Sequence, residues 1–132
     1  MSEQDKQKII LLIDDEINLQ QLIKIALKSR NYHVETANNG VEGLAKLETI
    51  EPDLIILDMN MPKMRGLEFY QRICDDTKCP RYPILMLTAR ANIEPIFKQL
   101  NIAGFIAKPF EIADLLHEVE SIIQKNQIPT SK

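Results

Sequence analysis

An apolar run that ends abruptly on a carboxylate is the feature that most constrains the fold of this chain. The run is Leu54–Leu57, which follows Pro52 and ends on Asp58. Four apolar residues are too few for a helix, so we predict a strand that is buried on both faces. Such strands occur in parallel sheets, where ligands bind beyond the carboxyl ends of the strands. The other strands therefore decide whether matching chemistry reaches Asp58.

Two further apolar runs share this pattern. Lys8–Ile13 ends on the pair Asp14 and Asp15, and Ile84–Leu87 ends on Thr88. Both runs are short and largely apolar, which predicts two more buried strands. Three strands would then carry carboxylate or hydroxyl side chains at one edge of a sheet.

Two shorter segments complete the predicted sheet, namely Tyr32–Ala37 and Gly104–Ala107, and Lys108 follows the second. Amphipathic segments alternate with the five strands. The predicted helices cover Glu16–Ser29, Val41 to Ile50, Leu67–Asp76, Asn92–Leu100 and Glu111–Lys125. This alternation predicts an α/β fold with a five-stranded parallel sheet in the order 2-1-3-4-5. Five helices would cover both faces, doubly wound as in flavodoxin.

The helical periodicity also predicts which side chains face the core. In the first helix we expect Leu22 on the apolar face and Gln20 on the opposite, polar face. Val41 begins the apolar stripe of the second helix. Tyr70, in the third helix, is expected to be a core aromatic residue.

The composition limits the function of the chain. Its 132 residues predict one compact domain over residues 1–126, a frayed tail over 127–132 and no output domain. A formal net charge of -3 argues against a nucleic-acid binder. There is no apolar stretch of about 20 residues and no signal peptide, so we expect a cytoplasmic protein that does not bind membranes. Cys74 and Cys79 are expected to be reduced and incidental.

The predicted sheet brings five polar side chains to one edge: Asp14, Asp15, Asp58, Thr88 and Lys108. Three carboxylates in a small site repel one another, which raises at least one pKa unless cations compensate. A divalent ion and the Lys108 ammonium group would supply that compensation. Mg²⁺ fits best because it prefers oxygen ligands and leaves room for phosphate oxygens. No His or Cys falls at this edge to favour zinc.

Each of these residues has a simpler interpretation when it is taken alone. Asp14 and Asp15 precede a helix and are suited to cap it. Thr88 is suited to bond nearby backbone groups, and Lys108 to be a solvated surface charge. We favour a functional site because all of these residues converge on the same edge.

Four motifs occur in order, each at the end of a predicted strand, and together they closely resemble the receiver domains of two-component response regulators. The motifs are Asp14-Asp15-Glu16, Asp58 followed by Asn60-Met61-Pro62 and Gly66, Thr88-Ala89, and Lys108-Pro109-Phe110. The resemblance covers nearly the whole chain. It implies a stand-alone response regulator in a histidine-to-aspartate phosphorelay, which is a signalling switch and not a conventional enzyme.

Matched position by position, the resemblance implies that Asp58 accepts a phosphoryl group. Asp15, the Asp58 carboxylate and the backbone carbonyl of Asn60 would ligate Mg²⁺. Asp14 would act through a metal-bound water. Lys108 would pair with Asp58 and then with the phosphoryl oxygens, which balances the charge of the transferred group.

The resemblance also implies a switch and its partners. Thr88 would hydrogen-bond one phosphoryl oxygen and the Ala89 N–H another, while Phe105 would move into the space that Thr88 leaves. A plain core position explains Phe105 equally well. Lys108-Pro109 resembles the cis peptide of the family, and Asn60 and Arg90 resemble the positions that flank the attacking water. The donor would be a sensor histidine kinase or a histidine phosphotransfer protein, and an unidentified downstream protein would bind the switched face.

Two other classes of function remain open. One is a phosphorylation-independent interaction module of the same fold. The other is an FMN binder, which lacks support because the Asp58–Gly66 loop carries an acid and Pro62 where a Gly/Ser/Thr-rich phosphate cradle is expected. Arg65 and the slightly short Thr88–Lys108 segment depart from the family pattern. The sequence names neither the kinase, the target nor the oligomeric state.

Overall fold

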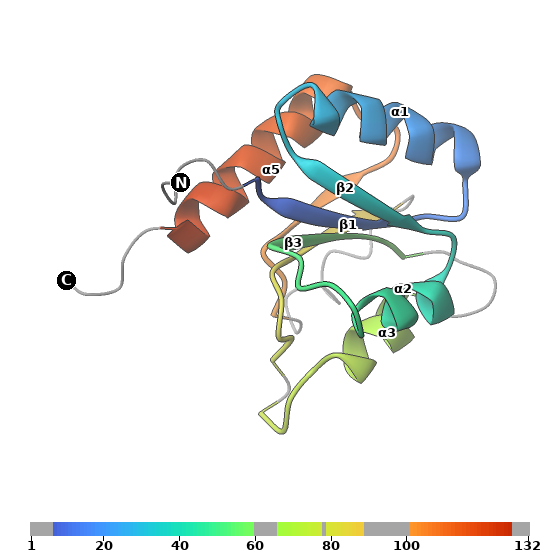
Figure 1. The fold of residues 1–132 in the computed structure, drawn as a ribbon, viewed down its shortest axis with the longest axis vertical. Helices are drawn as coiled ribbons and strands as arrows, with labels where there is room; N and C mark the ends of the chain where they lie inside the picture. The colour runs from blue at the N-terminus through green and yellow to red at the C-terminus, as the bar shows by residue number, and fades with distance from the viewer. Residues whose placement is uncertain (1–6, 60–65, 78, 89–100, 128–132) are drawn as a thin grey trace.

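The computed structural model describes residues 7–59, 66–77, 79–88 and 101–127. Its centre is a sheet of five parallel strands in the order β2-β1-β3-β4-β5 (Figure 1). The strands are β1 (Ile9–Ile13), β2 (His33–Ala37), β3 (Leu54–Asp58), β4 (Ile84–Thr88) and β5 (Gly104–Ala107). The predicted fold class and strand order are confirmed.

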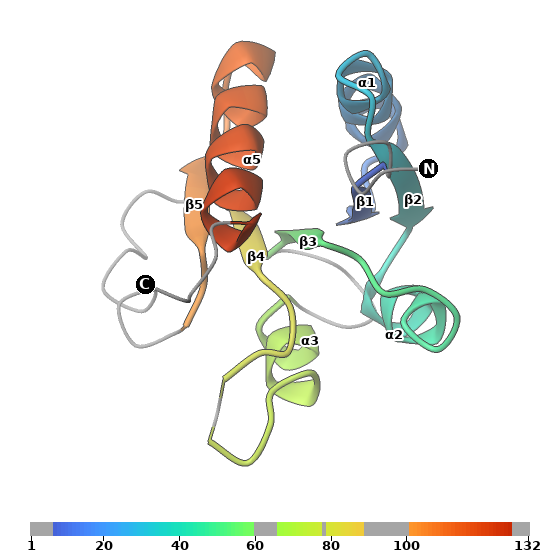
Figure 2. The same cartoon turned by 60° about the vertical axis from the view of Figure 1, so that its left-hand side comes forward.

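Helices cover both faces of this sheet. Figure 2 shows α1 and α5 on one face and α2 and α3 on the other. Their bounds are α1 (Ile17–Lys28), α2 (Gly40–Lys46), α3 (Gly66–Arg72) and α5 (Ile112–Gln127). The helix predicted over Asn92–Leu100 lies outside the described residues. α5 continues through Gln127, beyond its predicted end at Lys125.

The central strands are continuous apolar runs because both of their faces are buried. Every residue of β3 and β4 is buried, including Asp58 and Thr88 at their ends. One apolar cluster joins the sheet to α1 and α5, and a second joins it to α2 and α3. Tyr70 belongs to the second cluster and is only 4% exposed, which confirms its predicted core position. Parallel strands of this kind require cover on both faces.

The α2 helix packs on the sheet through glycine, which corrects the prediction for Val41. A Cβ atom on Gly43 would lie 2.5 Å from Ile13 Cδ1 and 3.0 Å from Phe69 Cε1. A larger residue at this position would therefore force the buried side chain of Ile13 to shift. Val41 lies outside this contact and is 53% exposed, so its predicted core position is wrong.

The α1 helix turns most of its predicted apolar face to the core, but two residues are exchanged. Gln20, Ile23 and Leu27 are buried, whereas Leu22 is 51% exposed. The predictions for Gln20 and Leu22 are therefore wrong. The reason is that Ile23 and Leu27 fix the rotation of the helix, and Gln20 lies three residues before Ile23 on the same face.

The α3 helix ends at Arg72, four residues before its predicted end at Asp76. Beyond it, Cys74 forms an antiparallel bridge with Pro80. The Asp75 side chain accepts hydrogen bonds from two backbone N–H groups of the following turn. An aspartate that bonds backbone groups in this way favours a turn over a helix.

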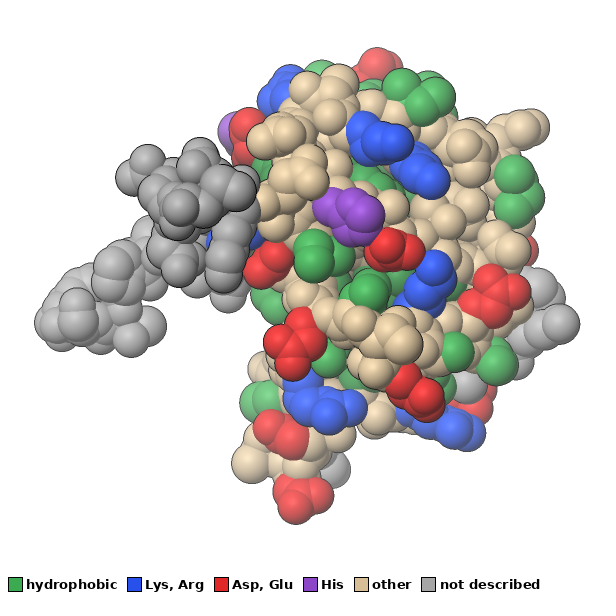
Figure 3. Space-filling view, viewed as in Figure 1, with side chains coloured by type: hydrophobic (Ala, Val, Ile, Leu, Met, Phe, Trp, Pro, Cys, Tyr) green, Lys and Arg blue, Asp and Glu red, His purple; other side chains and the backbone are tan. Residues whose placement is uncertain are grey.

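The described surface carries both signs of charge. On the face shown in Figure 3, Lys and Arg side chains are interspersed with Asp and Glu, and hydrophobic groups are scattered among them. None of the helices in the described part of the chain combines the length and the apolar character needed to cross a membrane. Cys74 and Cys79 are free thiols.

Candidate functional site

The register of the sheet places Asp14 beside Asp58. β1 and β3 are neighbouring parallel strands in which Ile13 pairs with Leu57. The residue that follows each of these two is an acid, so both acids lie at the same edge of the sheet. The Asp14 N–H donates to the Ala37 carbonyl at 3.1 Å, which continues the hydrogen bonding between β1 and β2 past the end of β1.

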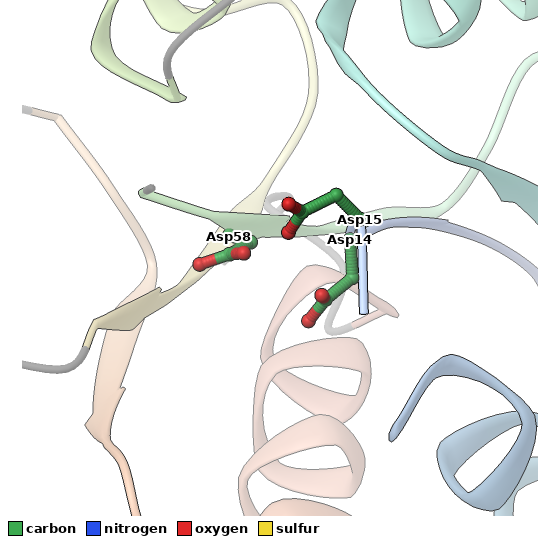
Figure 4. A group of neighbouring side chains, drawn as sticks. All are labelled: Asp14, Asp15 and Asp58. Atoms are coloured by element: carbon green, nitrogen blue, oxygen red, sulfur yellow. The ribbon is translucent and has the colours of Figure 1, made fainter. Parts of the chain in front are cut away.

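Three carboxylates meet at this edge. Figure 4 shows Asp14 and Asp15 extending from the end of β1 towards the region beside Asp58 at the end of β3. Each side chain offers an oxygen atom, and the three oxygens lie within 4.8 Å of one another. Asp14 and Asp58 are buried, at 0% and 2% exposure, while Asp15 is exposed. The cluster therefore opens to solvent on the Asp15 side.

Lys108 supplies positive charge to the two buried acids. Its Nζ atom lies 3.6 Å from Asp14 Oδ2 and 3.5 Å from Asp58 Oδ1. The residue follows β5, and its N–H donates to the Thr88 carbonyl at 2.6 Å, which ties it to the end of β4. The Lys108–Pro109 peptide bond is cis, as the resemblance predicts.

Helix capping does not account for the acids of β1. Asp14 Oδ1 accepts a hydrogen bond from the Glu16 N–H at 2.8 Å. The N-cap residue of α1, however, is Glu16, whose side chain makes no capping hydrogen bond. Asp14 Oδ2 is buried and has no hydrogen-bond partner among the described residues. Capping therefore explains at most one oxygen of one of the two acids.

Burial raises the pKa of the Asp14 carboxyl group above its ordinary value of 3.8. The negative charges of Asp15 and Glu16 raise it further, while the Glu16 hydrogen bond and the Lys108 charge oppose the shift. The predicted rise of a pKa in the cluster is thus confirmed for Asp14. Its main cause is desolvation, however, and the repulsion we predicted is a smaller contribution.

The raised pKa predicts how stability changes with pH in metal-free protein. The folded state holds the Asp14 proton more tightly than the unfolded state, so this group favours folding fully below pH 3.8. That contribution is lost as pH rises through the folded-state pKa. Asp14→Asn removes the buried charge and should therefore raise the free energy of unfolding by about 1–2 kcal/mol at neutral pH.

Urea unfolding in EDTA, measured for both proteins between pH 4 and pH 8, tests this expectation. The difference in unfolding free energy should shrink as the pH falls, because wild-type Asp14 becomes neutral like the Asn that replaces it. A difference in unfolding free energy that is constant over the whole pH range would show that the ionisation of Asp14 does not cause it.

The donor atoms of the cluster fit a hard divalent cation. The atoms that the cluster offers are carboxylate oxygens, and the buried Oδ2 atom of Asp14 has no hydrogen-bond donor among the described residues. Mg²⁺ prefers oxygen ligands and is commonly held by one or two carboxylates together with waters and phosphate oxygens. The exposure of Asp15 leaves a side from which such waters and a phosphate group can enter.

The remaining predicted residues divide into three groups. Thr88 is fully buried at the end of β4, where it pairs with Ala107 across the ladder. Phe105 lies on β5 and is 36% exposed, so the alternative of a buried core aromatic is wrong. Asn60 and Ala89, along with Arg65 and Arg90, lie outside the described residues.

Sequence analysis missed Gln20, which contacts the backbone of the acid turn. Its side chain is 3% exposed, and its Nε2 atom lies 2.9 Å from the Asp14 carbonyl oxygen. The signal was present in the sequence, because Gln20 stands three residues before Ile23 and seven before Leu27. Both spacings place it on the apolar face of α1.

Comparison with known proteins identifies the family of this site. A family model described as the response regulator receiver domain matches residues 10–120. The chain belongs to this family. The receiver domain has the acid cluster at the carboxyl edge of its sheet, as the topology of open α/β sheets leads one to expect.

Relatives of known name cover the receiver domain almost completely. A CpxR homologue from Haemophilus influenzae, named a transcriptional regulatory protein, is 35% identical over 124 residues, which are 92% of this chain and 53% of that protein. The receiver domain spans about half the length of the curated transcriptional regulators that it matches.

Solved structures match the receiver domain over their own full length. The chemotaxis response regulator CheY4 of Vibrio cholerae has a TM-score of 0.80 and 34% identity, covering 89% of this chain and 99% of that chain. The response regulator TrrA of Thermotoga maritima, solved in complex with Mg²⁺ and BeF, has a TM-score of 0.77 and 33% identity, covering 88% and 99%.

Proposed function

We propose that this receiver domain is a phosphorylation switch that accepts a phosphoryl group on Asp58 in the presence of Mg²⁺. One observation carries the proposal. A buried carboxylate at the end of β3 lies 3.5 Å from the ammonium group of Lys108 and beside the oxygens of Asp14 and Asp15. This arrangement places a nucleophile and a positive charge together next to a group that can hold a divalent ion.

The transfer follows from the placement of these groups. An Asp58 oxygen attacks phosphorus in line, an O–P bond forms, and the bond to the donor breaks with its electron pair leaving on the donor atom. Lys108 stabilises the negative charge on the equatorial phosphoryl oxygens. Asp15, Asp58 and the Asn60 carbonyl would hold Mg²⁺, with Asp14 acting through a metal-bound water. The ion, when bound, would neutralise further phosphoryl charge.

The product of this transfer is an acyl phosphate, so the signal is transient. A mixed anhydride of this kind hydrolyses in water, which returns Asp58 to its starting form. Thr88 and the Ala89 N–H would contact the phosphoryl oxygens, and the rate of hydrolysis would depend on Asn60 and Arg90. Phe105 would change position together with Thr88, and its partial exposure on β5 is compatible with that movement.

The partners follow from the chemistry of the donor and the family. A sensor histidine kinase or a histidine phosphotransfer protein would supply the phosphoryl group from a phosphohistidine. A downstream protein would bind the face that changes on phosphorylation. That the chain acts as a stand-alone regulator in the cytoplasm stays a prediction. The alternative function is the phosphorylation-independent interaction module.

Intact mass spectrometry tests the proposed function directly. Protein incubated with acetyl phosphate and Mg²⁺ should gain one phosphoryl group, a shift of about 80 Da. The gain should disappear when a chelator replaces Mg²⁺. No gain in the presence of bound Mg²⁺ would favour the phosphorylation-independent module.

A further inference from the structure

A buried side-chain amide braces the turn that carries the two acids of β1. The amide belongs to Gln20 on α1, which is 3% exposed. Its Nε2 atom lies 2.9 Å from the Asp14 carbonyl oxygen, 3.2 Å from the Ala37 carbonyl oxygen and 3.1 Å from Asn38 Oδ1. An NH₂ group has two hydrogens, so these three acceptors share two donors.

These contacts join α1 to two segments that are distant from each other in the sequence, the turn after β1 and the connection after β2. Asp14 follows β1, Ala37 ends β2, and Asn38 begins the connection to α2. The Ala37 carbonyl also accepts the Asp14 N–H at 3.1 Å. The Asn38 N–H in turn donates to Glu42 Oε1 at 2.8 Å, which anchors that connection to α2. Gln20 is thus the centre of a network that holds the acid turn against the rest of the sheet.

The bond to the Asp14 carbonyl matters because that carbonyl belongs to the peptide unit between Asp14 and Asp15. Holding its oxygen fixes the plane of this peptide and therefore the direction in which the Asp15 side chain leaves the backbone. Within the described residues, no hydrogen bond or ion pair holds the exposed Asp15 carboxylate itself. Its placement towards Asp58 depends on the backbone of the turn.

We propose that Gln20 is a positioning residue for divalent-ion binding, acting through the Asp14–Asp15 peptide without contacting the ion. The inference rests on the proposed function, because it requires that the acid cluster bind Mg²⁺. Partners that orient metal ligands typically change metal affinity by 10- to 100-fold when they are removed. Gln20 orients two ligands at once through a single backbone carbonyl.

Gln20→Met is the variant that isolates the amide. Met has a similar length and suits a buried site, but it cannot donate a hydrogen bond. Mg²⁺ affinity of the full chain, measured by isothermal titration calorimetry, should fall about 10-fold. The Mg²⁺ concentration for half-maximal phosphorylation by acetyl phosphate should rise by the same factor. The rate at saturating Mg²⁺ should stay within about threefold of wild type, because the reacting groups are untouched.

Two controls separate positioning from a general loss of stability. Leu27→Ala removes a buried side chain from the far end of α1 and should destabilise the protein by about 2–5 kcal/mol without changing Mg²⁺ affinity. Gln21→Met makes the same chemical change on the exposed face of α1 and should change neither property. Gln20→Asn, which keeps the amide but shortens its reach, provides a second variant should Gln20→Met fold poorly.

The outcomes distinguish this inference from the proposed function. If wild type binds Mg²⁺ and both Gln20 variants bind it with the same affinity, the positioning role of Gln20 is overturned and the proposed function stands. An equal loss of affinity in Leu27→Ala would also overturn the positioning role, since the effect would then be one of helix stability. Absence of Mg²⁺ binding in wild type would overturn the proposed function, and this inference with it.

Discussion

Asp58→Asn should abolish phosphoryl uptake from acetyl phosphate in the presence of Mg²⁺. An amide of the same shape is not a nucleophile at phosphorus, so no species about 80 Da heavier should form. Asp58 is 2% exposed at the end of β3, and Asn can occupy its place without new cavities. The substitution also removes one of the buried negative charges near Lys108. Intact mass over a time course gives the measurement, and circular dichroism checks the fold.

Asp76→Asn is the matched control for this result. It makes the same change of charge on an exposed acid in the turn after α3, outside the acid cluster. This variant should gain the phosphoryl group as wild type does. A mass gain of wild-type size in Asp58→Asn would contradict Asp58 as the acceptor. Another carboxylate would then accept the phosphoryl group, and Asp14 and Asp15 would be tested first.

Lys108→Met should slow phosphorylation by at least about 10²-fold at saturating Mg²⁺, the range found when one charge-stabilising donor is removed from a reacting site. The Lys108 Nζ atom lies 3.5 Å from Asp58 Oδ1, and the Lys108 side chain is 21% exposed. It is therefore placed to meet charge that develops on the phosphoryl oxygens. The measurement is the initial rate of mass gain with acetyl phosphate as donor.

Lys108→Met should also raise the pKa of Asp14 further, because the Lys108 charge lowers that pKa in the wild type. Metal-free protein should consequently lose stability at neutral pH, where Asp14 and Asp58 would remain buried without this cation. Lys125→Met, near the end of α5 and exposed, is the control and should change neither the rate nor the stability. A rate for Lys108→Met within a few-fold of wild type would contradict its proposed role.

The sequence by itself determined the strands, their order and the edge at which the polar residues meet. β3 and β4 are buried on both faces, and each is apolar at every residue before the polar one that ends it, which makes these strands visible without any other information. The alternation with helices then restricts the connections to right-handed crossovers and the sheet to few possible orders. Asp14, Asp15, Asp58 and Lys108 come together as a consequence of this topology.

Only the tertiary structure decided how the helices are rotated and how the acid turn is held. Leu22 and Val41 have the periodicity of core residues, yet both face solvent because contacts elsewhere on their helices set the rotation. Gln20 is polar in sequence and buried in the fold, since its three acceptors come from segments that meet only when the sheet has formed. The pKa of Asp14 is likewise a property of burial, which depends on every layer around it. Local sequence fixes apolar runs and turns, whereas contacts between distant segments fix rotation, burial and the charge state of the site.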